Sequence, residues 1–141
     1  MLLGEYNHNI DDKGRLIIPA KCREELGDTV YICRGREGCL YLYPQDAWED
    51  FVSEISESSR KQKDARKIQR YYFGSASETS FDKQGRVLIT PKLREHGNLT
   101  KDVVLVGMNN HMEIWDMTRW EENDDISEEE LDAIEERSED E

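Results

Sequence analysis

Short runs of β-branched and aromatic residues alternate along the chain with segments of helical periodicity. Runs of Val, Ile, Leu and Tyr bounded by loops rich in Gly or Asn are typical of β-strands. We predict strands over residues 5–10, 16–18, 30–34, 40–43, 78–81, 87–89, 103–106 and 113–115. Short helices are predicted over residues 20–26 and 91–96. Each is closed by a glycine, Gly27 or Gly97, because glycine readily adopts the left-handed conformation that ends a helix.

Two longer helices are predicted in the middle of the chain. The first begins at Pro44, since proline suits the first turn of a helix. Four apolar residues recur in it at the spacing of one helix face: Trp48, Phe51, Val52 and Ile55. The second covers residues 64–73, stops at Gly74, and is basic, with Lys63, Arg66, Lys67 and Arg70. We expect the two helices to pair as a hairpin, with the basic residues on a solvated face.

The chain repeats itself. Residues 10–19 return in similar form as residues 81–90, at an offset of 71, and the match continues into the short helices. A series of matches at nearly constant offset indicates two homologous halves. We divide the chain into a first half (1–60), a basic helical linker (61–74), a second half (75–120) and an acidic tail (121–141). Each half is too small to bury a core alone, so the halves must complete one another.

The repeated element is a tight turn of the form Asp-x-x-Gly-Arg between two strands. The aspartate, Asp11 or Asp82, can accept a hydrogen bond from the backbone two residues on. The glycine, Gly14 or Gly85, supplies the positive φ that such a turn needs. A single turn of this form would be a plain hairpin with a solvated arginine. Because the turn occurs twice, a binding role is a second interpretation.

The turn arginines, Arg15 and Arg86, are chemically able to read DNA, because a guanidinium fork can bond guanine O6 and N7 together. The neighbouring lysines Lys13 and Lys83 suit phosphates, although simple solvation explains them equally well. The two aspartates repel DNA, so we assign them to the turn or to orienting the arginine four residues on. Four further residues are candidate phosphate contacts: Lys21, Arg23, Lys92 and Arg94.

The net charge of −13 argues at first against a nucleic-acid partner, but the charge is unevenly spread. Residues 121–141 contain thirteen acidic residues and one arginine, whereas the other 120 residues contain 19 acidic and 18 basic ones. In the tail, residues 127–130 form a possible capping box, followed by a sparse apolar pair, Leu131 and Ile134. We expect this tail to be disordered, or to become helical only against a partner.

Several classes of protein are disfavoured by composition. We find no apolar run long enough to cross a membrane and no signal peptide. Cys22, Cys33 and Cys39 fit thiols in a reducing compartment better than disulfides or a zinc site. No motif of catalysis, nucleotide binding or metal ligation appears. We therefore expect a cytoplasmic protein that is not an enzyme and has no metal, cofactor or small-molecule substrate.

The sequence resembles the bacterial MraZ family. The resemblance rests on the duplicated Asp-x-x-x-Arg motif and on residues 4–6, 11–21, 40–44, 70–74, 82–86 and 113–115, and it extends to about residue 120. It implies a mainly β fold with helices (α+β), in which two tandem AbrB-like double-split β-barrel halves form a pseudo-dimer. The family's DNA contacts map onto Asp11, Arg15, Asp82 and Arg86. In the second half the proline after the strand, Pro91, comes one position later in the repeat than Pro19 does in the first. The two halves therefore need not be equivalent in function.

The resemblance also implies a nucleoid-associated transcriptional regulator. Such a protein binds G-rich direct repeats in double-stranded DNA upstream of the division and cell-wall gene cluster, as a ring-shaped homo-oligomer, an octamer or dodecamer. In a ring, several weakly basic turns would engage successive repeats together. An alternative is a ring-forming interaction protein that acts through its acidic tail, and a truncation after Trp120 would separate the two. An antitoxin with an acidic extension ranks lower, because its usual architecture has one such half per chain.

Overall fold

Eight strands and six helices follow one another in residues 1–57, 61–123 and 126–139, which the computed structural model describes. The strands are β1 (Glu5–Asn9), β2 (Arg15–Ile17), β3 (Thr29–Arg34), β4 (Leu40–Pro44), β5 (Ser77–Ser80), β6 (Arg86–Leu88), β7 (Asp102–Gly107) and β8 (Met112–Asp116). The helices are α1 (Ala20–Leu26), α2 (Gln45–Ser56), α3 (Gln62–Phe73), α4 (Pro91–Gly97), α5 (Met117–Asn123) and α6 (Glu128–Glu139). Every predicted strand is confirmed, and its ends differ by at most one residue. Helix α5 is an addition that the sequence patterns missed.

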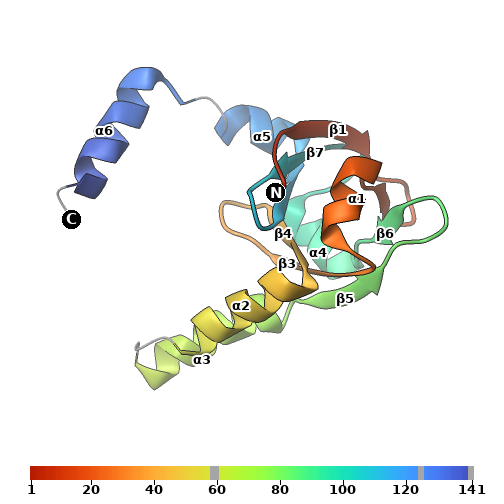
Figure 1. The fold of residues 1–141 in the computed structure, drawn as a ribbon, viewed down its shortest axis with the longest axis horizontal. Helices are drawn as coiled ribbons and strands as arrows, with labels where there is room; N and C mark the ends of the chain where they lie inside the picture. Colours follow the sequence, from red (N-terminus) through yellow and green to blue (C-terminus); the bar gives the residue numbers. More distant parts are fainter. Residues whose placement is uncertain (58–60, 124–125, 140–141) are drawn as a thin grey trace.

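The strands form a six-stranded antiparallel sheet in the order β1-β7-β8-β4-β3-β5 and a two-stranded ribbon of β2 and β6 (Figure 1). The two halves exchange their first strands, since β1 pairs with β7 of the second half and β5 pairs with β3 of the first. The ribbon likewise takes one strand from each half. The fold is therefore α+β, and neither half is a complete sheet without the other, as their small size predicted.

The strand registers show that the two halves are related by a pseudo-two-fold axis. In the ribbon, Leu16 lies opposite Val87, its own equivalent in the repeat, and in the large sheet Tyr41 lies opposite its equivalent Glu113. The outer pairs obey the same relation, because the β1–β7 ladder is repeated by the β5–β3 ladder. The axis must pass midway between a residue and the equivalent residue that it faces. The chain is thus a tandem pseudo-dimer.

One hydrophobic core lies between the ribbon and the large sheet. Leu16 and Val87 point inward from the ribbon and are almost completely buried. These two residues belong to one cluster of buried side chains, to which both halves contribute. Its other members include Ile18, Val30, Ile32, Leu40, Leu42, Ile89, Leu93, Val103, Leu105, Met112 and Ile114. Because the core is shared, the ribbon is held rigidly against the sheet rather than as a free hairpin.

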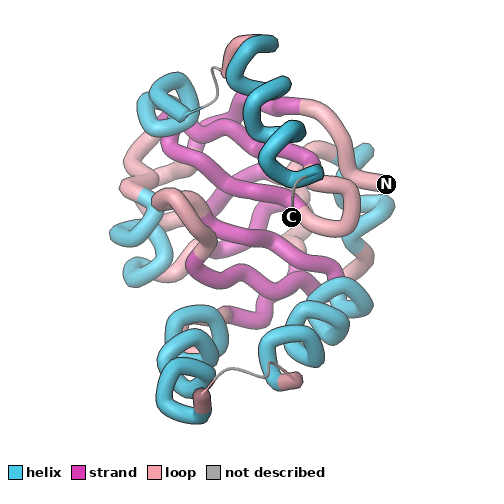
Figure 2. The backbone as a smooth tube through the Cα atoms, turned by 90° about the vertical axis from the view of Figure 1, so that its left-hand side faces the viewer, coloured by secondary structure: helices cyan, strands magenta, loops and turns pink. Residues whose placement is uncertain are grey.

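Helices α2 and α3 pair as the predicted hairpin and project from one end of the sheet (Figures 1 and 2). Aromatic contacts fix them: Trp48 stacks on Tyr31 of β3 at 5.3 Å, and Phe51 meets Tyr72 of α3 edge-on at 5.0 Å. Pro44 precedes α2 as its N-cap instead of occupying the first turn. It also ends strand β4, because its extended ψ of 165° belongs to a strand.

The end of α4 differs from the prediction. Gly97 is the last residue of the helix, and the left-handed residue that follows it is Asn98, with φ of 53°. Gly97 is buried, and a Cβ there would come within 3.2 Å of Leu99. Close packing explains the glycine, while asparagine tolerates the left-handed conformation. Gly27, at φ of 79°, does close α1 as predicted.

The tail contains helix α6, which extends away from the sheet (Figure 1). The hydroxyl of Ser127 accepts a hydrogen bond from the backbone N–H of Glu130 at 3.1 Å, which is one half of the predicted capping box. Residues 126–138 are all exposed. The structure thus shows a helix where the sequence favoured disorder or partner-induced folding.

Candidate nucleic-acid interface

The first turn is organised by Asp11. Its Oδ1 accepts the backbone N–H of Lys13 at 3.0 Å and that of Arg15 at 2.8 Å, while its Oδ2 accepts Arg15 Nε at 2.7 Å. One carboxylate therefore closes the turn and holds the arginine side chain. The backbone hydrogen bond from Arg15, reinforced by its guanidinium, lowers the pKa of Asp11 below its ordinary value of 3.8.

The second turn repeats this geometry. Asp82 Oδ1 accepts the N–H groups of Gln84 and Arg86, both at 2.9 Å, and Oδ2 accepts Arg86 Nε at 2.8 Å. The pKa of Asp82 is lowered for the same reasons, the backbone hydrogen bond from Arg86 first. The position that donates to the aspartate is Lys13 in one turn and Gln84 in the other, so Lys13 and Lys83 are not equivalent residues. Asp12 stands where the second turn has Lys83.

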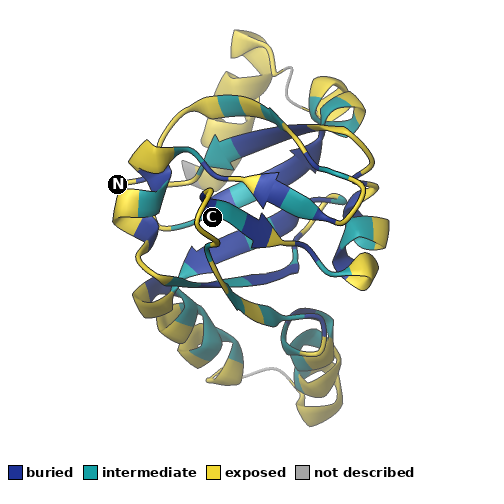
Figure 3. Cartoon of the chain, turned by 90° about the vertical axis from the view of Figure 1, so that its right-hand side faces the viewer, coloured by how far each residue is buried: buried dark blue, intermediate teal, exposed yellow. Residues whose placement is uncertain are grey.

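The arginines lie on the outer face of the β2–β6 ribbon. In its register Arg15 faces Leu88 and Ile17 faces Arg86. Since alternate residues of a strand share a face, these four side chains point away from the buried Leu16 and Val87. The ribbon thus presents two arginines on one diagonal and two aliphatic side chains on the other. The ribbon itself lies on the side of the molecule turned to the viewer in Figure 3.

Sequence reasoning missed the two aliphatic members of this face. Ile17 and Leu88 are 45% and 51% exposed, although the apolar residues on either side of each are almost completely buried. Each belongs to a run of three apolar residues, so periodicity alone does not show which of the three points outward. The signal was their equivalence at the offset of 71, together with the strand alternation set by the arginine.

The two arginines are held mainly through Nε, which leaves most of their terminal nitrogens available to a ligand. Each gives its Nε to its own aspartate, and among the described residues no protein acceptor is recorded for the terminal nitrogens of Arg15. Arg86 Nη1 lies 4.0 Å from Asp11 Oδ2, across the pseudo-two-fold axis. The two turns therefore share an electrostatic contact, and the guanidinium groups are fixed in direction by carboxylates rather than left to rotate.

Arg23 and Arg94 lie beneath the turns, each under the turn of the other half. A Cβ at Gly85 would collide with the Arg23 guanidinium, and one at Gly14 would lie 2.8 Å from Arg94 Nε. Arg94 Nε donates to the backbone oxygen of Ile89 at 3.1 Å, whereas Arg23 Nε is buried with no recorded partner in the part of the chain described. Both arginines are half-buried, so they support the turns from below.

The four candidate lysines differ in position from these arginines. Lys13 and Lys83 are exposed on the turns, and Lys21 and Lys92 are exposed on α1 and α4. Turn residues 11–15 carry no net charge, while residues 82–86 carry +1, because Lys83 stands in the place of Asp12 and Gln84 in the place of Lys13. The second turn is therefore the more favourable neighbour for a phosphate. Contact of any of these residues with DNA stays a prediction.

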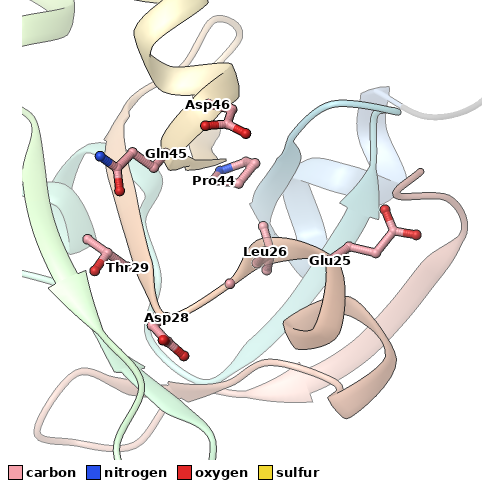
Figure 4. Close-up of a pocket in the computed structure, with 8 residues that line it drawn as sticks. Glu25, Leu26, Asp28, Thr29, Pro44, Gln45 and Asp46 are labelled. Atoms are coloured by element: carbon pink, nitrogen blue, oxygen red, sulfur yellow. The ribbon is translucent and has the colours of Figure 1, made fainter.

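Other features of the described residues offer no competing site. A pocket of about 410 Å³ between α1 and α2 is lined by Glu25, Asp28 and Asp46, which makes it acidic (Figure 4). Burial raises the pKa of the thiol of Cys33 to about 12, so this cysteine is not a thiolate near neutral pH. No metal-ligating cluster and no helix long and apolar enough to span a membrane occurs in the ranges that the structure describes.

Comparison with known proteins connects this geometry to a family. The family model described as "MraZ protein, putative antitoxin-like" matches the chain twice, over residues 1–71 and 72–141. The chain is 46% identical to the "Transcriptional regulator MraZ" of Lactobacillus johnsonii, over 96% of this chain and 99% of that protein. It is 42% identical to the protein of the same name from Clostridium tetani, over 90% of this chain and 89% of that protein.

Proposed function

The chain belongs to the MraZ family, and from that premise we propose that it is a transcriptional regulator that binds double-stranded DNA through the outer face of the β2–β6 ribbon. The observation that carries this proposal is the pair of carboxylate-held arginines, Arg15 and Arg86, on a two-stranded ribbon at one edge of the molecule. A regulator that acts on the chromosome works in the cytoplasm, associated with the nucleoid.

The major groove of DNA admits a two-stranded β-ribbon such as β2–β6. The free ends of Arg15 and Arg86 can each bond guanine O6 and N7, the commonest specific contact in that groove. Ile17 and Leu88, on the other diagonal of the same face, can contact the methyl group of thymine. Lys13 and Lys83 are placed on the turns beside this face, where phosphates would fix its position.

One ribbon is too weakly charged for strong binding by itself. Its two turns together carry a net charge of +1, and the body of the protein is nearly neutral. We propose that several copies form a ring, an octamer or dodecamer, whose ribbons engage successive G-rich direct repeats upstream of the division and cell-wall gene cluster. Linked binding sites raise the effective concentration, so weak contacts add up to useful affinity.

A DNA titration of arginine variants tests this function. Fluorescence anisotropy with a duplex of tandem G-rich repeats should show that Arg15→Ala weakens binding by about 1–3 kcal/mol, a loss of roughly 5- to 150-fold, and reduces the preference over a scrambled duplex. Arg86→Ala should act in the same direction. Arg66→Ala is the matched control, because Arg66 is an exposed arginine on α3. Unchanged binding by the Arg15→Ala and Arg86→Ala variants would refute the assignment.

A further inference from the structure

Helix α6 leaves apolar side chains in water. Leu131 and Ile134 are 43% and 37% exposed, and they lie on one side of the helix because residues three apart are neighbours on its surface. Glu128 and Glu135 stand three residues before and four residues after Leu131, so they flank the apolar pair on the same side. An isolated helix of 12 residues is marginally stable in water, which indicates that this face is completed by another surface.

A surface of opposite character lies along α3. A groove of about 380 Å³ is lined by Ile68, Tyr71 and Tyr72 at its floor and by Arg36, Glu37 and Lys67 at its rim. We call it the α3 groove. Tyr71 is fixed there, because its hydroxyl donates to the backbone oxygen of Gly35 at 2.5 Å and the guanidinium carbon of Arg34 lies 4.4 Å from its ring centroid. The groove is thus preformed, apolar below and mainly basic above.

The two surfaces are complementary in charge. Arg36 and Lys67 are exposed at the rim of the α3 groove, and Glu37 is the one acidic residue lining it. Helix α6 has seven acidic residues and one arginine. An apolar pair flanked by glutamates would therefore meet an apolar floor flanked by an arginine and a lysine. Helix-in-groove recognition uses anchors spaced i and i+3 in this way.

The helix that fills the α3 groove is expected to come from another copy of the chain. Helix α6 stands clear of α3 of its own chain in two perpendicular views, and its described residues are exposed (Figures 1 and 2). Helix and groove are different surfaces, so the contact is head-to-tail when each copy gives its helix to one neighbour and receives the helix of another. A contact of this kind generates a ring when its rotation closes.

We propose that α6 of one copy docks in the α3 groove of a second copy, with Leu131 and Ile134 on the apolar floor and the flanking glutamates against Arg36 and Lys67. This contact lies away from the DNA-reading face, because α3 and α6 occupy the side of the molecule opposite the ribbon in Figure 1. Assembly through α6 therefore leaves the ribbons free. The inference concerns contact between copies and does not depend on DNA reading.

Photo-crosslinking of the full chain tests the contact without DNA. A photoreactive benzoyl-phenylalanine replaces Leu131, and copies grown in ¹⁴N and ¹⁵N media are mixed, irradiated and digested for mass spectrometry. We expect mixed-isotope cross-links between α6 and peptides of α3. Cross-links found only within one isotope, or only to segments outside the α3 groove, would overturn the proposal.

Charge variants make the test specific. Lys67→Glu should lower the yield of mixed cross-links at least about fivefold, since like charges then face each other. The matched control is Arg66→Glu, which makes the same charge change on the other flank of α3, beside Phe73, and should leave the yield unchanged. Mixing Lys67→Glu copies with Glu135→Lys copies that carry the cross-linker should restore it. A yield that is equally insensitive to Lys67→Glu and Arg66→Glu would contradict docking in this groove.

Discussion

Each residue of the Asp-x-x-Gly-Arg turn has a distinct physical task. The aspartate accepts two backbone N–H groups and the arginine Nε, so turn closure and side-chain orientation depend on the same carboxylate. The glycine has φ of 85° in the first turn and 76° in the second, where a side chain would be strained. The arginine keeps its terminal nitrogens for a ligand. The motif thus holds one guanidinium group in a fixed orientation.

The glycine of the turn has a second role that a substitution can measure. Gly14→Ala places a Cβ 2.7 Å from the backbone oxygen of Ile89, in addition to the strain of positive φ. Gly27 has a similar φ of 79°, with a ψ of −166° that is essentially restricted to glycine, and open space around it, so Gly27→Ala isolates the conformational strain, about 1–3 kcal/mol. We expect Gly14→Ala to lower the free energy of unfolding, measured with urea, by more than Gly27→Ala does. Equal losses would show that the close approach is unimportant.

The difference between the two turns is also testable. Asp12→Lys gives the first turn the lysine that the second turn has at Lys83. If turn residues contact phosphates, the variant should bind DNA more tightly, and its plot of log K against log[salt] should steepen by about 0.9 for the one added phosphate contact. Asp50→Lys makes the same charge change on an exposed position of α2 and serves as the control. The same salt slope in both variants would place the first turn away from the phosphates.

At the scale of single residues, the sequence predicted most of the candidate site but missed two residues on the outer face of the ribbon. Asp11, Arg15 and their copies were found because their types and spacing repeat. Ile17 and Leu88 were not, because each lies inside a run of three apolar residues, and the strand pairing then shows that they share the outer face with the arginines. The structure packs Arg23 and Arg94 under the turns of the opposite half, a contact distant in sequence, and their contact with phosphates stays a prediction.

The individual strands and helices were largely predictable, because each has a local hydrophobic pattern. The exchange of strands between the halves was not, since pairing of β1 with β7 joins residues almost a hundred positions apart. Helix α5 was missed for a different reason. It occupies the place of α2 in the repeat but is shorter, with seven residues against twelve, so its helical periodicity is weaker.

The loop between β7 and β8 carries a histidine that links stability to pH. His111 stacks on Tyr43 with ring centroids 4.7 Å apart, and burial lowers the pKa of its imidazole below the ordinary 6.5. A group whose pKa is lower in the folded state stabilises the protein fully above its ordinary pKa and loses that contribution as the pH falls through the folded value. We expect the free energy of unfolding to decrease from pH 8 to pH 6.

The variant His111→Phe keeps an aromatic stack and removes the titrating group, so its free energy of unfolding should fall less over this range. Part of the dependence should remain, because burial also lowers the pKa of His96. Urea denaturation at the two pH values measures both effects. An unchanged pH dependence in His111→Phe would mean that His111 does not titrate differently in the folded and unfolded states.

At the scale of the whole molecule, the acidic tail lies away from the two turns that the pseudo-two-fold axis relates. The pseudo-two-fold axis brings the two turns together on one ribbon, while the thirteen acidic residues of 121–141 belong to a tail that begins on the opposite side (Figure 1). The net charge of −13 is therefore a poor guide to what the ribbon binds. The proposed DNA contact and the proposed contact between copies therefore lie on opposite sides of the molecule.

The most direct measurement of DNA reading is a nuclease footprint of the full-length protein on its own upstream region at moderate salt. We predict several protected segments at a constant spacing, because identical ribbons engage successive repeats, and loss of all of them together in the double variant Arg15→Ala, Arg86→Ala. A region without protection, or a footprint that survives in the double variant, would contradict DNA reading by the ribbon.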